Sequence, residues 1–446
     1  MVASHVAVLG LGITGLATVN YLLRAGYKVT VFDTRKQPPG EDKLTAGVTL
    51  IKGDLRGERL IDYPLIISSP GIALATPALQ TAIKAGCSVI GDIELFAQKL
   101  KTSPYQHAKC VTITGSNGKS TVTSLLGEMA KKARVRVAVG GNIGVPALDL
   151  LSPDIDLYIL ELSSFQLETT QSLNADIATI LNVSEDHLDR YESYQHYIDT
   201  KQSIYSQAKI ALFNKQDKLT FSTNQLQQTK SFGFSDADYQ VICDNYDQNY
   251  LAKGTQTLLN VKQLKLSGKH NWLNALAAIA LGEAVGLEMD AMLATLSYYT
   301  GLEHRCEFVA QVAGVRWIND SKATNIGATQ AALKGLSETI SGDVHLILGG
   351  QGKGADFNEL SPALSDVKGE ICCFGADALK IQKALPCANL VSDLSAAIKH
   401  IANHACSGDL VILSPACASL DMYPNFMARG DHFKALVKTL TPSENK

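Results

Sequence analysis

A turn rich in glycine and hydroxyl residues, between positions 115 and 121, carries the clearest chemistry in this chain. It reads Gly-Ser-Asn-Gly-Lys-Ser-Thr and follows the β-branched run 111–114. Backbone amides of such a turn face an anion when a helix follows, the lysine adds a cation, and the next hydroxyl can bind Mg²⁺. A Walker A loop has a glycine six residues before its lysine, but here Ile113 occupies that position. The turn is therefore shorter than a Walker A loop. We predict a phosphate-binding loop here, with a plain strand-to-helix turn as the alternative.

A second glycine turn lies near the N-terminus. Gly10-Leu-Gly-Ile-Thr-Gly15 follows the apolar run 6–9, and Asp33 ends the next such run. This spacing matches the fingerprint of dinucleotide-binding domains. The fingerprint indicates a turn that can bind a diphosphate. No other motif in the sequence indicates that the bound molecule is a hydride acceptor such as NAD. We therefore predict a nucleotide-sugar diphosphate at this turn and no NAD, with Asp33, Thr34 and Arg35 near its base and ribose; a nicotinamide dehydrogenase is the alternative.

Acids and a histidine follow two further apolar runs. Glu161 ends the run 157–160, and His187 lies among acids after the run 177–181. A carboxylate at the end of a buried strand is costly unless it has a partner or a task. We predict that Glu161 and the loop hydroxyl of Ser120 together bind Mg²⁺, which would be that partner. The alternative is that Glu161 caps the helix that follows. His187 has either a metal or catalytic role or a surface position.

Polar clusters continue to the end of the chain. Asn271 opens an Ala- and Leu-rich helix, where it can cap the helix or contact an adenine. Arg305 stands where a hinge would let it meet a γ-phosphate. Lys353, in a glycine-rich loop after the run 344–348, suits a substrate carboxylate. Cys417 has no histidine partner nearby in sequence and is not expected to be a nucleophile.

The elements that must hold these residues form three α/β series. A chain of 446 residues exceeds what one core usually organises. Short apolar runs alternate with helical stretches, and the segment from about 219 to 266 suggests a small antiparallel appendage on the second series. We predict domains at residues 1–97, 98–303 and 304–446. Because ligands bind at the carboxyl ends of parallel strands, the loops after the strands are the expected sites.

Composition excludes several classes of function. The net charge of −3 comes without blocks of like charge, so nothing indicates nucleic-acid binding, and the chain has no apolar run long enough to cross a membrane. Nine scattered cysteines without a Cys-x-x-Cys pair argue against disulfides or a cysteine-built zinc site. We expect a cytoplasmic protein that is a monomer and uses small-molecule substrates.

Together these motifs resemble the Mur ligase family, ATP-dependent enzymes that form amide bonds in peptidoglycan precursors. The resemblance covers essentially the whole chain and rests on the order of seven signatures: Gly115 to Thr121, Glu161 to Glu168, Asn182 to Arg190, His270-Asn271, His304-Arg305, Asp320 to Asn325 and Ser414 to Asp421. The Asp-Asn-Pro-Arg motif of the branch that adds a diamino acid is absent. The dinucleotide-like N-terminal domain, which folylpolyglutamate synthases lack, is present. Both features favour the branch that joins D-glutamate to UDP-N-acetylmuramoyl-L-alanine.

The resemblance implies a fold, a mechanism and roles for individual residues. The fold would be a Rossmann-like N-terminal domain that binds the UDP-sugar, a central P-loop ATPase-like domain, and a Rossmann-like C-terminal domain that takes the incoming amino acid and contributes to the ATP site. The substrate carboxylate would take the γ-phosphoryl of ATP, and the amine of D-glutamate would then attack the acyl phosphate. Catalytic roles would fall to Lys119, His187, Lys201 and Arg305. ATP would contact Gly115, Ser116, Asn117, Gly118, Lys119, Ser120, Thr121, Asn271, Arg305, Asp320 and Lys322.

The remaining implied contacts concern the two other substrates and two Mg²⁺ ions. The UDP substrate would meet Ile13, Thr14, Asp33, Thr34, Arg35, Ser69, Gly71, Asn142, Ser163 and His187. D-Glutamate would meet Thr324, Lys353, Ser419, Leu420 and Phe426. The metal ligands would be Ser120, Glu161, His187 and Lys201 as a carbamate, since carbamylation turns a cation into an anion that can hold Mg²⁺. A nucleotide-gated switch protein that only senses ATP is a further alternative.

Overall fold

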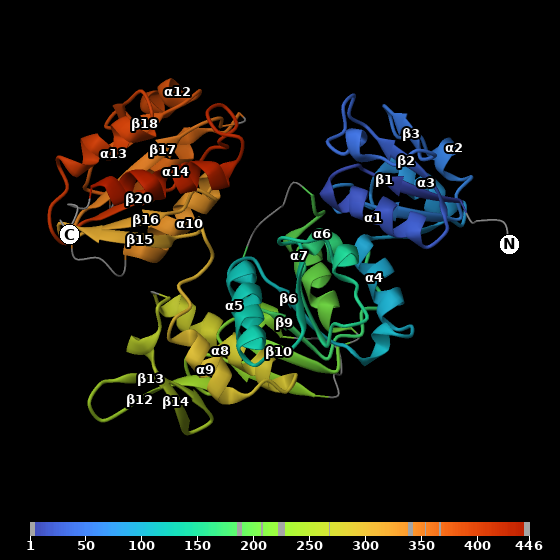
Figure 1. Ribbon diagram of the computed structural model, residues 1–446, viewed down its shortest axis with the longest axis horizontal. Coiled ribbons are helices and arrows are strands. Elements are labelled where there is room, and N and C mark those ends of the chain that lie inside the picture. The colour runs from blue at the N-terminus through green and yellow to red at the C-terminus, as the bar shows by residue number, and fades with distance from the viewer. Residues whose placement is uncertain are drawn as a thin grey trace. The chain divides into compact units, whose positions relative to one another are not determined.

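The computed structural model describes residues 5–184, 190–206, 208–221, 228–266, 268–337, 342–352, 354–364 and 367–440 (Figure 1). The chain divides into two compact units. The first comprises Met1–Gln263 and Trp272–Ser297, and the second comprises Leu264–Asn271 and Tyr298–Lys446. Each unit is considered by itself. The first contains two sheets and the second contains one.

The N-terminal sheet has five parallel strands in the order β3-β2-β1-β4-β5. Their bounds are β1 (His5–Leu9), β2 (Lys28–Asp33), β3 (Thr49–Lys52), β4 (Leu65–Ser68) and β5 (Ser88–Ile90). Helix α1 (Ile13–Arg24) packs on one face, and α2 (Gly57–Leu60) and α3 (Pro77–Lys84) pack on the other. The direction of strand succession reverses between β1 and β4, which is the place where ligands bind in such sheets.

Helix α4 (Asp92–Leu100) links the first two sheets. Its apolar residues belong to one hydrophobic core that contains residues of both the N-terminal and the central sheet. The Glu94 carboxylate accepts two hydrogen bonds of 2.7 Å, from the backbone amides of Gln171 and Ser172. The boundary predicted between residues 97 and 98 lies inside this helix, and the exact domain boundaries stay a prediction.

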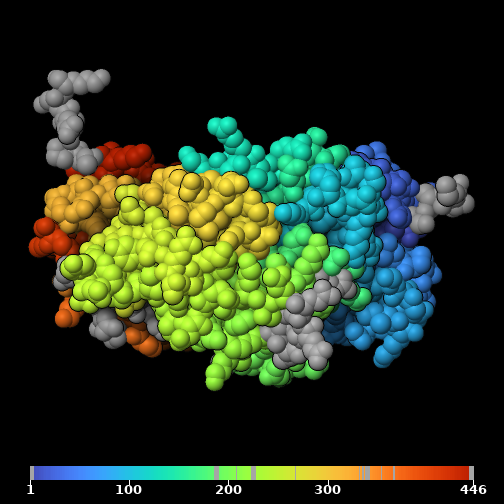
Figure 2. Space-filling model, turned by 90° about the horizontal axis from the view of Figure 1, so that it is seen from below, coloured from blue at the N-terminus to red at the C-terminus, as the bar shows by residue number. Residues whose placement is uncertain are grey.

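The central sheet has nine strands in the order β14-β13-β12-β11-β10-β9-β6-β8-β7. Their bounds are β6 (Lys109–Thr114), β7 (Val137–Gly141), β8 (Leu157–Glu161), β9 (Ile177–Ile180), β10 (Ile210–Asn214), β11 (Thr229–Phe232), β12 (Tyr239–Cys243), β13 (Asn249–Lys253) and β14 (Gln256–Asn260). Strands β12 to β14 are antiparallel, but β11 pairs with β10 in parallel. The expected appendage therefore extends the main sheet, and Figure 2 shows it in yellow-green at the surface.

Five helices accompany the central sheet: α5 (Lys119–Lys132), α6 (Ser164–Leu167), α7 (Tyr194–Gln202), α8 (Lys269–Ala284) and α9 (Met289–Leu296). Residues 275–281 of α8 are wholly buried. A helix that is apolar on every side belongs in a core, which explains why this stretch shows no amphipathic pattern. Its burial holds Asn274, on the same helix, beside Gly118 of the phosphate loop.

The second unit holds a six-stranded sheet in the order β15-β16-β20-β17-β18-β19. The strands are β15 (Glu307–Val312), β16 (Val315–Asn319), β17 (Val344–Gly349), β18 (Ile371–Phe374), β19 (Asn389–Leu390) and β20 (Leu410–Leu413). Only β15, at the edge, is antiparallel to its neighbour among these described strands. Two cores lie on opposite faces of the sheet. One face packs α10 (Ile326–Ser337) and α12 (Ala378–Ala384), and the other packs α13 (Leu394–Ala402) and α14 (Phe426–Thr439).

Short helices complete the described chain: α11 (Ser361–Leu364) and the 3₁₀ turns η1 (Glu41–Lys43), η2 (Tyr105–His107), η3 (Ala147–Leu150), η4 (Ser203–Tyr205), η5 (Lys218–Thr220), η6 (Val261–Gln263) and η7 (Phe357–Leu360). None of the helices that the structure describes has the length and apolar character needed to cross a membrane.

Candidate active site

The loop between β6 and α5 requires glycine at two positions. Gly115 has φ +150° and Gly118 has φ +81°, both in the region that favours glycine. A Cβ on Gly118 would lie 2.7 Å from Oδ1 of Asn274, on α8. The backbone therefore passes close to its neighbours and leaves the start of α5 without a side-chain cap. Uncapped amides at a helix start can bind a phosphate.

Lys119 and Ser120 follow directly at the start of α5. The Lys119 ammonium donates to the carbonyls of Gly115, at 2.7 Å, and Ser116, at 3.0 Å. Ser120 is buried, with 5% of its surface exposed. The lysine thus folds back over its own loop, so its charge lies at the place where the loop amides are expected to receive a phosphate.

The loop after β9 holds the phosphate loop in place. Asn182 accepts a bond from the Asn117 amide at 2.8 Å and donates to its carbonyl at 3.0 Å. The Ser116 hydroxyl bonds to the backbone of Ser184, and it lies 3.1 Å from the hydroxyl of Tyr197 on α7. These hydrogen bonds hold the phosphate loop, which lies between β6 and α5, against the loop after β9. Neither Tyr197 nor the pairing role of Asn182 was predicted from the sequence.

Lys201, on α7, is a buried lysine, with 2% of its surface exposed. Its ammonium donates to the Gly115 carbonyl at 3.2 Å and lies 4.7 Å from the centre of the Tyr197 ring. The side chain thus reaches the phosphate loop from a residue 86 positions further along the chain. Burial of a lysine beside a phosphate loop is consistent with the role that the family resemblance implies, which stays a prediction.

Glu161 lies at the end of β8 with 2% of its surface exposed. Asn142 donates to its Oε1 at 3.0 Å, while among the described residues its Oε2 has no hydrogen-bond partner. The helix that follows is capped by Ser163 and Gln166 in a capping box, so Glu161 is not its cap. A buried carboxylate oxygen without a proton donor suits a cation, and the donor set of carboxylate and Ser120 hydroxyl oxygens fits Mg²⁺.

The N-terminal glycine turn is equally tight. A Cβ on Gly15 would collide with the carbonyl oxygen of Gly10, which itself has φ +85°. The Ser69 hydroxyl, after β4, donates to that same carbonyl at 3.2 Å. The turn after β1 and the loop after β4 therefore meet at the reversal point of the sheet. Ile13, the first residue of α1, is 78% exposed there.

Asp33 ends β2 and organises this turn. Its Oδ2 accepts a bond of 2.7 Å from the Leu11 amide, and the Arg35 guanidinium forms a two-point pair with the carboxylate at 2.6 and 2.9 Å. The Arg35 hydrogen bond lowers the pKa of Asp33 to about 2, although burial opposes it. Thr34 and Gly71 are exposed nearby. The Asp33 oxygens are thus already engaged, which differs from an aspartate free to bind a ribose.

In the second unit, Asp320 lies just after β16 and is 5% exposed. Its carboxylate accepts bonds from the Ser414 hydroxyl at 2.8 Å and the Cys306 amide at 3.1 Å. Burial raises the pKa of Asp320 to about 6, against the opposing effects of these bonds and of Arg305. Arg305 itself is exposed. The loop that holds Lys322 is fixed through a bond of 3.0 Å from the Lys322 amide to the His304 carbonyl.

The residues predicted for D-glutamate follow strands of this same sheet. Ser419 is buried and Leu420 is 64% exposed. Phe426 starts α14, and its carbonyl accepts a bond of 2.8 Å from the Ser321 hydroxyl. Thr324 lies partly buried in the loop after β16. The fold therefore places Thr324, Ser419, Leu420 and Phe426 at the carboxyl edge of one sheet, while their contacts with a substrate stay a prediction.

Arg429, on α14, is a buried residue that the sequence did not single out. It has no exposed surface, and it donates four hydrogen bonds of 2.9 to 3.2 Å. The acceptors are the hydroxyl and carbonyl of Ser321 and the carbonyls of Gly349 and Cys417. One side chain thus joins the loops after β16, β17 and β20. Burial lowers the pKa of Arg429 to about 10.

Several other predicted residues are located by the elements that carry them. Asn271 lies in the first turns of α8 and is partly buried, and Thr14 lies at the start of α1. Thr121 lies within α5. His187 and Lys353 lie outside the described residues. In the part of the chain that is described, no three His, Cys, Asp or Glu side chains form a metal-binding group.

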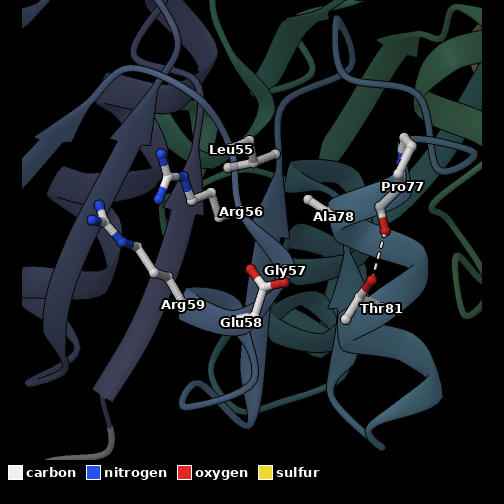
Figure 3. Close-up of a pocket in the computed structure, with 8 residues that line it drawn as sticks. All are labelled: Leu55, Arg56, Gly57, Glu58, Arg59, Pro77, Ala78 and Thr81. Atoms are coloured by element: carbon white, nitrogen blue, oxygen red, sulfur yellow. Dashed lines mark hydrogen bonds between the residues drawn. The ribbon is translucent and has the colours of Figure 1, made fainter.

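A depression of about 680 Å³ lies elsewhere on the N-terminal sheet. Figure 3 shows Arg56 and Arg59 on one side of it and Pro77 and Thr81 of α3 on the other. Both arginines are exposed, and none of the residues predicted for substrate lines the depression. It is therefore separate from the candidate active site.

Comparison with known proteins places these features in a family. Family models match three consecutive parts of the chain: the Mur ligase MurD-like N-terminal domain at residues 4–91, the Mur ligase middle domain at 113–282, and the Mur ligase glutamate ligase domain at 304–417. The chain belongs to the Mur ligase family. The predicted three-part α/β architecture is thereby confirmed at the level of the family.

Curated relatives and solved structures agree with that membership. The UDP-N-acetylmuramoylalanine--D-glutamate ligases of Haemophilus influenzae (strain 86-028NP) and Aliivibrio fischeri (strain MJ11) are 48% and 50% identical over 436 residues, which is 97% of this chain and 98% and 97% of theirs. A solved UDP-N-acetylmuramate-alanine ligase, MurC, from Thermotoga maritima matches with a TM-score of 0.60 at 19% identity, covering 98% of this chain and 99% of its own. This Mur ligase thus shares the fold of that enzyme.

Proposed function

We propose that this Mur ligase joins D-glutamate to UDP-N-acetylmuramoyl-L-alanine at the expense of ATP, in the synthesis of peptidoglycan precursors. The observation that carries the proposal is identity of about 50%, over nearly the full length of both chains, to ligases of that name. The phosphate loop, the buried Glu161 and the N-terminal diphosphate turn supply the matching chemistry. We place the reaction in the cytoplasm.

The chemistry requires positive charge, because a carboxylate must approach the γ-phosphate of ATP. We assign the binding of the triphosphate to Lys119 and the backbone amides of residues 115–121. We assign the binding of its γ-phosphoryl group to Arg305. In-line transfer would give an acyl phosphate and ADP. The amine of D-glutamate would then attack the acyl carbon, and phosphate would leave.

Mg²⁺ would be held by Glu161 and the Ser120 hydroxyl, together with phosphate oxygens of ATP. When bound, it would neutralise charge on the β- and γ-phosphates. The second ion that the family resemblance implies would be held near His187 and Lys201, with the lysine as a carbamate. Glu161 is suited to its part because Asn142 orients one carboxylate oxygen and leaves the other available.

The UDP substrate would bind the N-terminal sheet together with loops of the central sheet, and D-glutamate would bind the sheet of the second unit. We assign the uridine and diphosphate to Ile13, Thr14, Asp33, Thr34, Arg35, Ser69, Gly71, Asn142, Ser163 and His187. We assign D-glutamate to Thr324, Lys353, Ser419, Leu420 and Phe426, and the adenosine of ATP to Asn271, Asp320 and Lys322. Asp33, whose oxygens bind Arg35 and the Leu11 amide, would act on the uridine nucleotide by positioning Arg35 and the turn, and titration with NADH tests the dehydrogenase alternative.

The test is product analysis by mass spectrometry. Purified protein, MgATP and UDP-N-acetylmuramoyl-L-alanine are incubated with a panel of amino acids, and phosphate release is followed in parallel. We expect one new amide product with D-glutamate and none with L-glutamate or lysine. Equal products with those amino acids would overturn the substrate assignment. Phosphate release that needs no amino acid would favour an ATP-sensing switch, and tight binding of NADH would favour a dehydrogenase.

A further inference from the structure

We propose that Arg190 is a positioning residue that ties the loop 69–71 of the N-terminal sheet to the strand-end loops of the central sheet. Through this tie it would set the affinity for the sugar-nucleotide substrate. The inference rests on the proposed function for the identity of that substrate. The tie itself rests on the contacts that follow.

Arg190 uses all three nitrogens of its guanidinium. Nε and Nη2 donate to the two carboxylate oxygens of Glu168, at 3.2 and 2.9 Å. Nη1 donates to the carbonyl of Pro70 at 2.8 Å. The guanidinium also lies over the ring of Phe165, 4.1 Å from its centre. The Arg190 and Glu168 side chains are only 11% and 12% exposed, so the pair is largely removed from water.

Each partner belongs to a loop of the candidate active site. Pro70 stands between Ser69 and Gly71, which we assign to the nucleotide substrate. Glu168 follows α6, the helix that Ser163 caps two residues after Glu161. Arg190 itself follows the segment that contains His187. A single planar side chain therefore sets the separation between the loop that would bind the diphosphate and the loops that would bind the reacting groups.

Arginine is required for this geometry. Its rigid fork can bind a carboxylate at two points and still direct a third nitrogen to a carbonyl. A lysine keeps the charge, but its compact ammonium cannot make all three bonds at these separated acceptors. With the lysine engaged at Glu168, the Pro70 carbonyl would lose its donor, and the loop 69–71 would lose its connection to the central sheet.

The chain contains a matched control. Arg136 forms the same two-point pair with Asp156, at 2.8 and 2.6 Å. These residues directly precede β7 and β8, at the edge of the sheet opposite to the carboxyl ends of the strands. Their side chains are 61% and 39% exposed. Replacement of Arg136 by lysine therefore changes a more exposed ion pair of the same two-point geometry without touching the loops of the candidate site.

The experiment compares Arg190→Lys, Glu168→Gln and Arg136→Lys with the unmodified protein. Calorimetric titration measures binding of UDP-N-acetylmuramoyl-L-alanine, and steady-state assays give the KM for each substrate. We expect Arg190→Lys to weaken nucleotide binding at least tenfold, while KM for ATP and for D-glutamate changes less than twofold. Glu168→Gln should weaken it by a smaller factor, and Arg136→Lys should leave it unchanged. Equal nucleotide affinity in Arg190→Lys would overturn the proposal, as would parallel changes in all three KM values.

Hydrogen exchange separates this proposal from the proposed function. In Arg190→Lys, the amides of Ser69, Gly71 and Ile72 should exchange faster than in the unmodified protein, while amides of β6 stay protected. If the unmodified protein neither binds the nucleotide nor forms product, the proposed function fails, and this exchange still decides whether Arg190 ties the loop. Unchanged exchange at these amides would contradict the tie whatever the enzyme's substrate.

Discussion

Asp320 shows how a single residue of the candidate site sets a cost for the fold. Its carboxylate is almost fully buried, and burial raises its pKa from 3.8 to about 6. A carboxyl group whose pKa is higher in the folded than in the unfolded protein stabilises the fold while it is protonated. This contribution is complete below the unfolded-state pKa and is lost as pH rises through the folded-state pKa. The folded protein therefore bears the cost of an ionised, buried Asp320 above about pH 6.

Replacement of Asp320 by asparagine should remove this cost. We expect Asp320→Asn to exceed the unmodified protein in free energy of unfolding at pH 7.5, by no more than about 3 kcal/mol. The difference should shrink as pH falls from 6 to 4, because the native carboxyl becomes neutral. Urea unfolding at pH 4, 5, 6 and 7.5 measures this. A difference that is independent of pH would contradict the assignment, and ligase activity should fall if Asp320 binds ATP.

Lys119 tests the phosphate loop at the same scale. Its ammonium lies over the loop carbonyls, so Lys119→Ala removes the cation without removing a backbone amide. We expect kcat to fall by at least about 100-fold, while the affinity for the uridine nucleotide stays within twofold. Lys131→Ala, at the far end of α5 and 62% exposed, serves as the control and should retain full activity. Normal turnover by Lys119→Ala would show that the loop is not catalytic.

At the scale of elements, the sequence predicted the parts that local patterns encode. The runs 6–9, 111–114 and 177–180 lie in strands, and each of the two glycine turns follows a strand and precedes a helix, as predicted. The short strands β3, β5 and β19 were not predicted, because their sequences Thr-Leu-Ile-Lys, Ser-Val-Ile and Asn-Leu contain no more than two apolar residues each and show no clear apolar pattern. Strand β15 was not predicted either. It is an edge strand with a register irregularity, and its two faces alternate poorly.

The contacts that join loops were beyond prediction for a different reason. Arg429 donates to Ser321 across 108 residues of chain, and Asn182 pairs with Asn117 across 65. Nothing in the polar sequence around Arg429 distinguishes it from a surface arginine, because its burial follows from how α14 packs on the sheet. The same holds for Arg190, which the sequence offered only as the last residue of a motif.

Arg429 should be essential to its part of the fold. Arg429→Met would remove the donors to buried carbonyls after three strands, so we expect a loss of about 3 to 5 kcal/mol in the free energy of unfolding of the second unit. Arg429→Lys should lose less, because it keeps some of these bonds. Met427→Ala, on the same helix and 46% exposed, should change stability by no more than about 0.5 kcal/mol. Guanidinium unfolding compares the three variants, and a loss below about 1 kcal/mol for Arg429→Met would contradict this role.

At the scale of the whole molecule, each unit has cores of its own. The N-terminal and central sheets share one core through α4, and the two cores described for the second unit are built from residues of its own sheet and helices. We therefore expect the two units to unfold in separate transitions. The chain should then respond to changes in either unit separately.

Differential scanning calorimetry can test this separation. We expect two transitions, with a total enthalpy larger than the van 't Hoff enthalpy of either. UDP at about 100 times its Kd should stabilise the first unit by about 2.7 kcal/mol and raise only its transition, because the nucleotide is expected to bind the turn after β1. Arg429→Met should lower only the other transition, since its contacts lie in the second unit. A single transition that both changes move would show that the units unfold together.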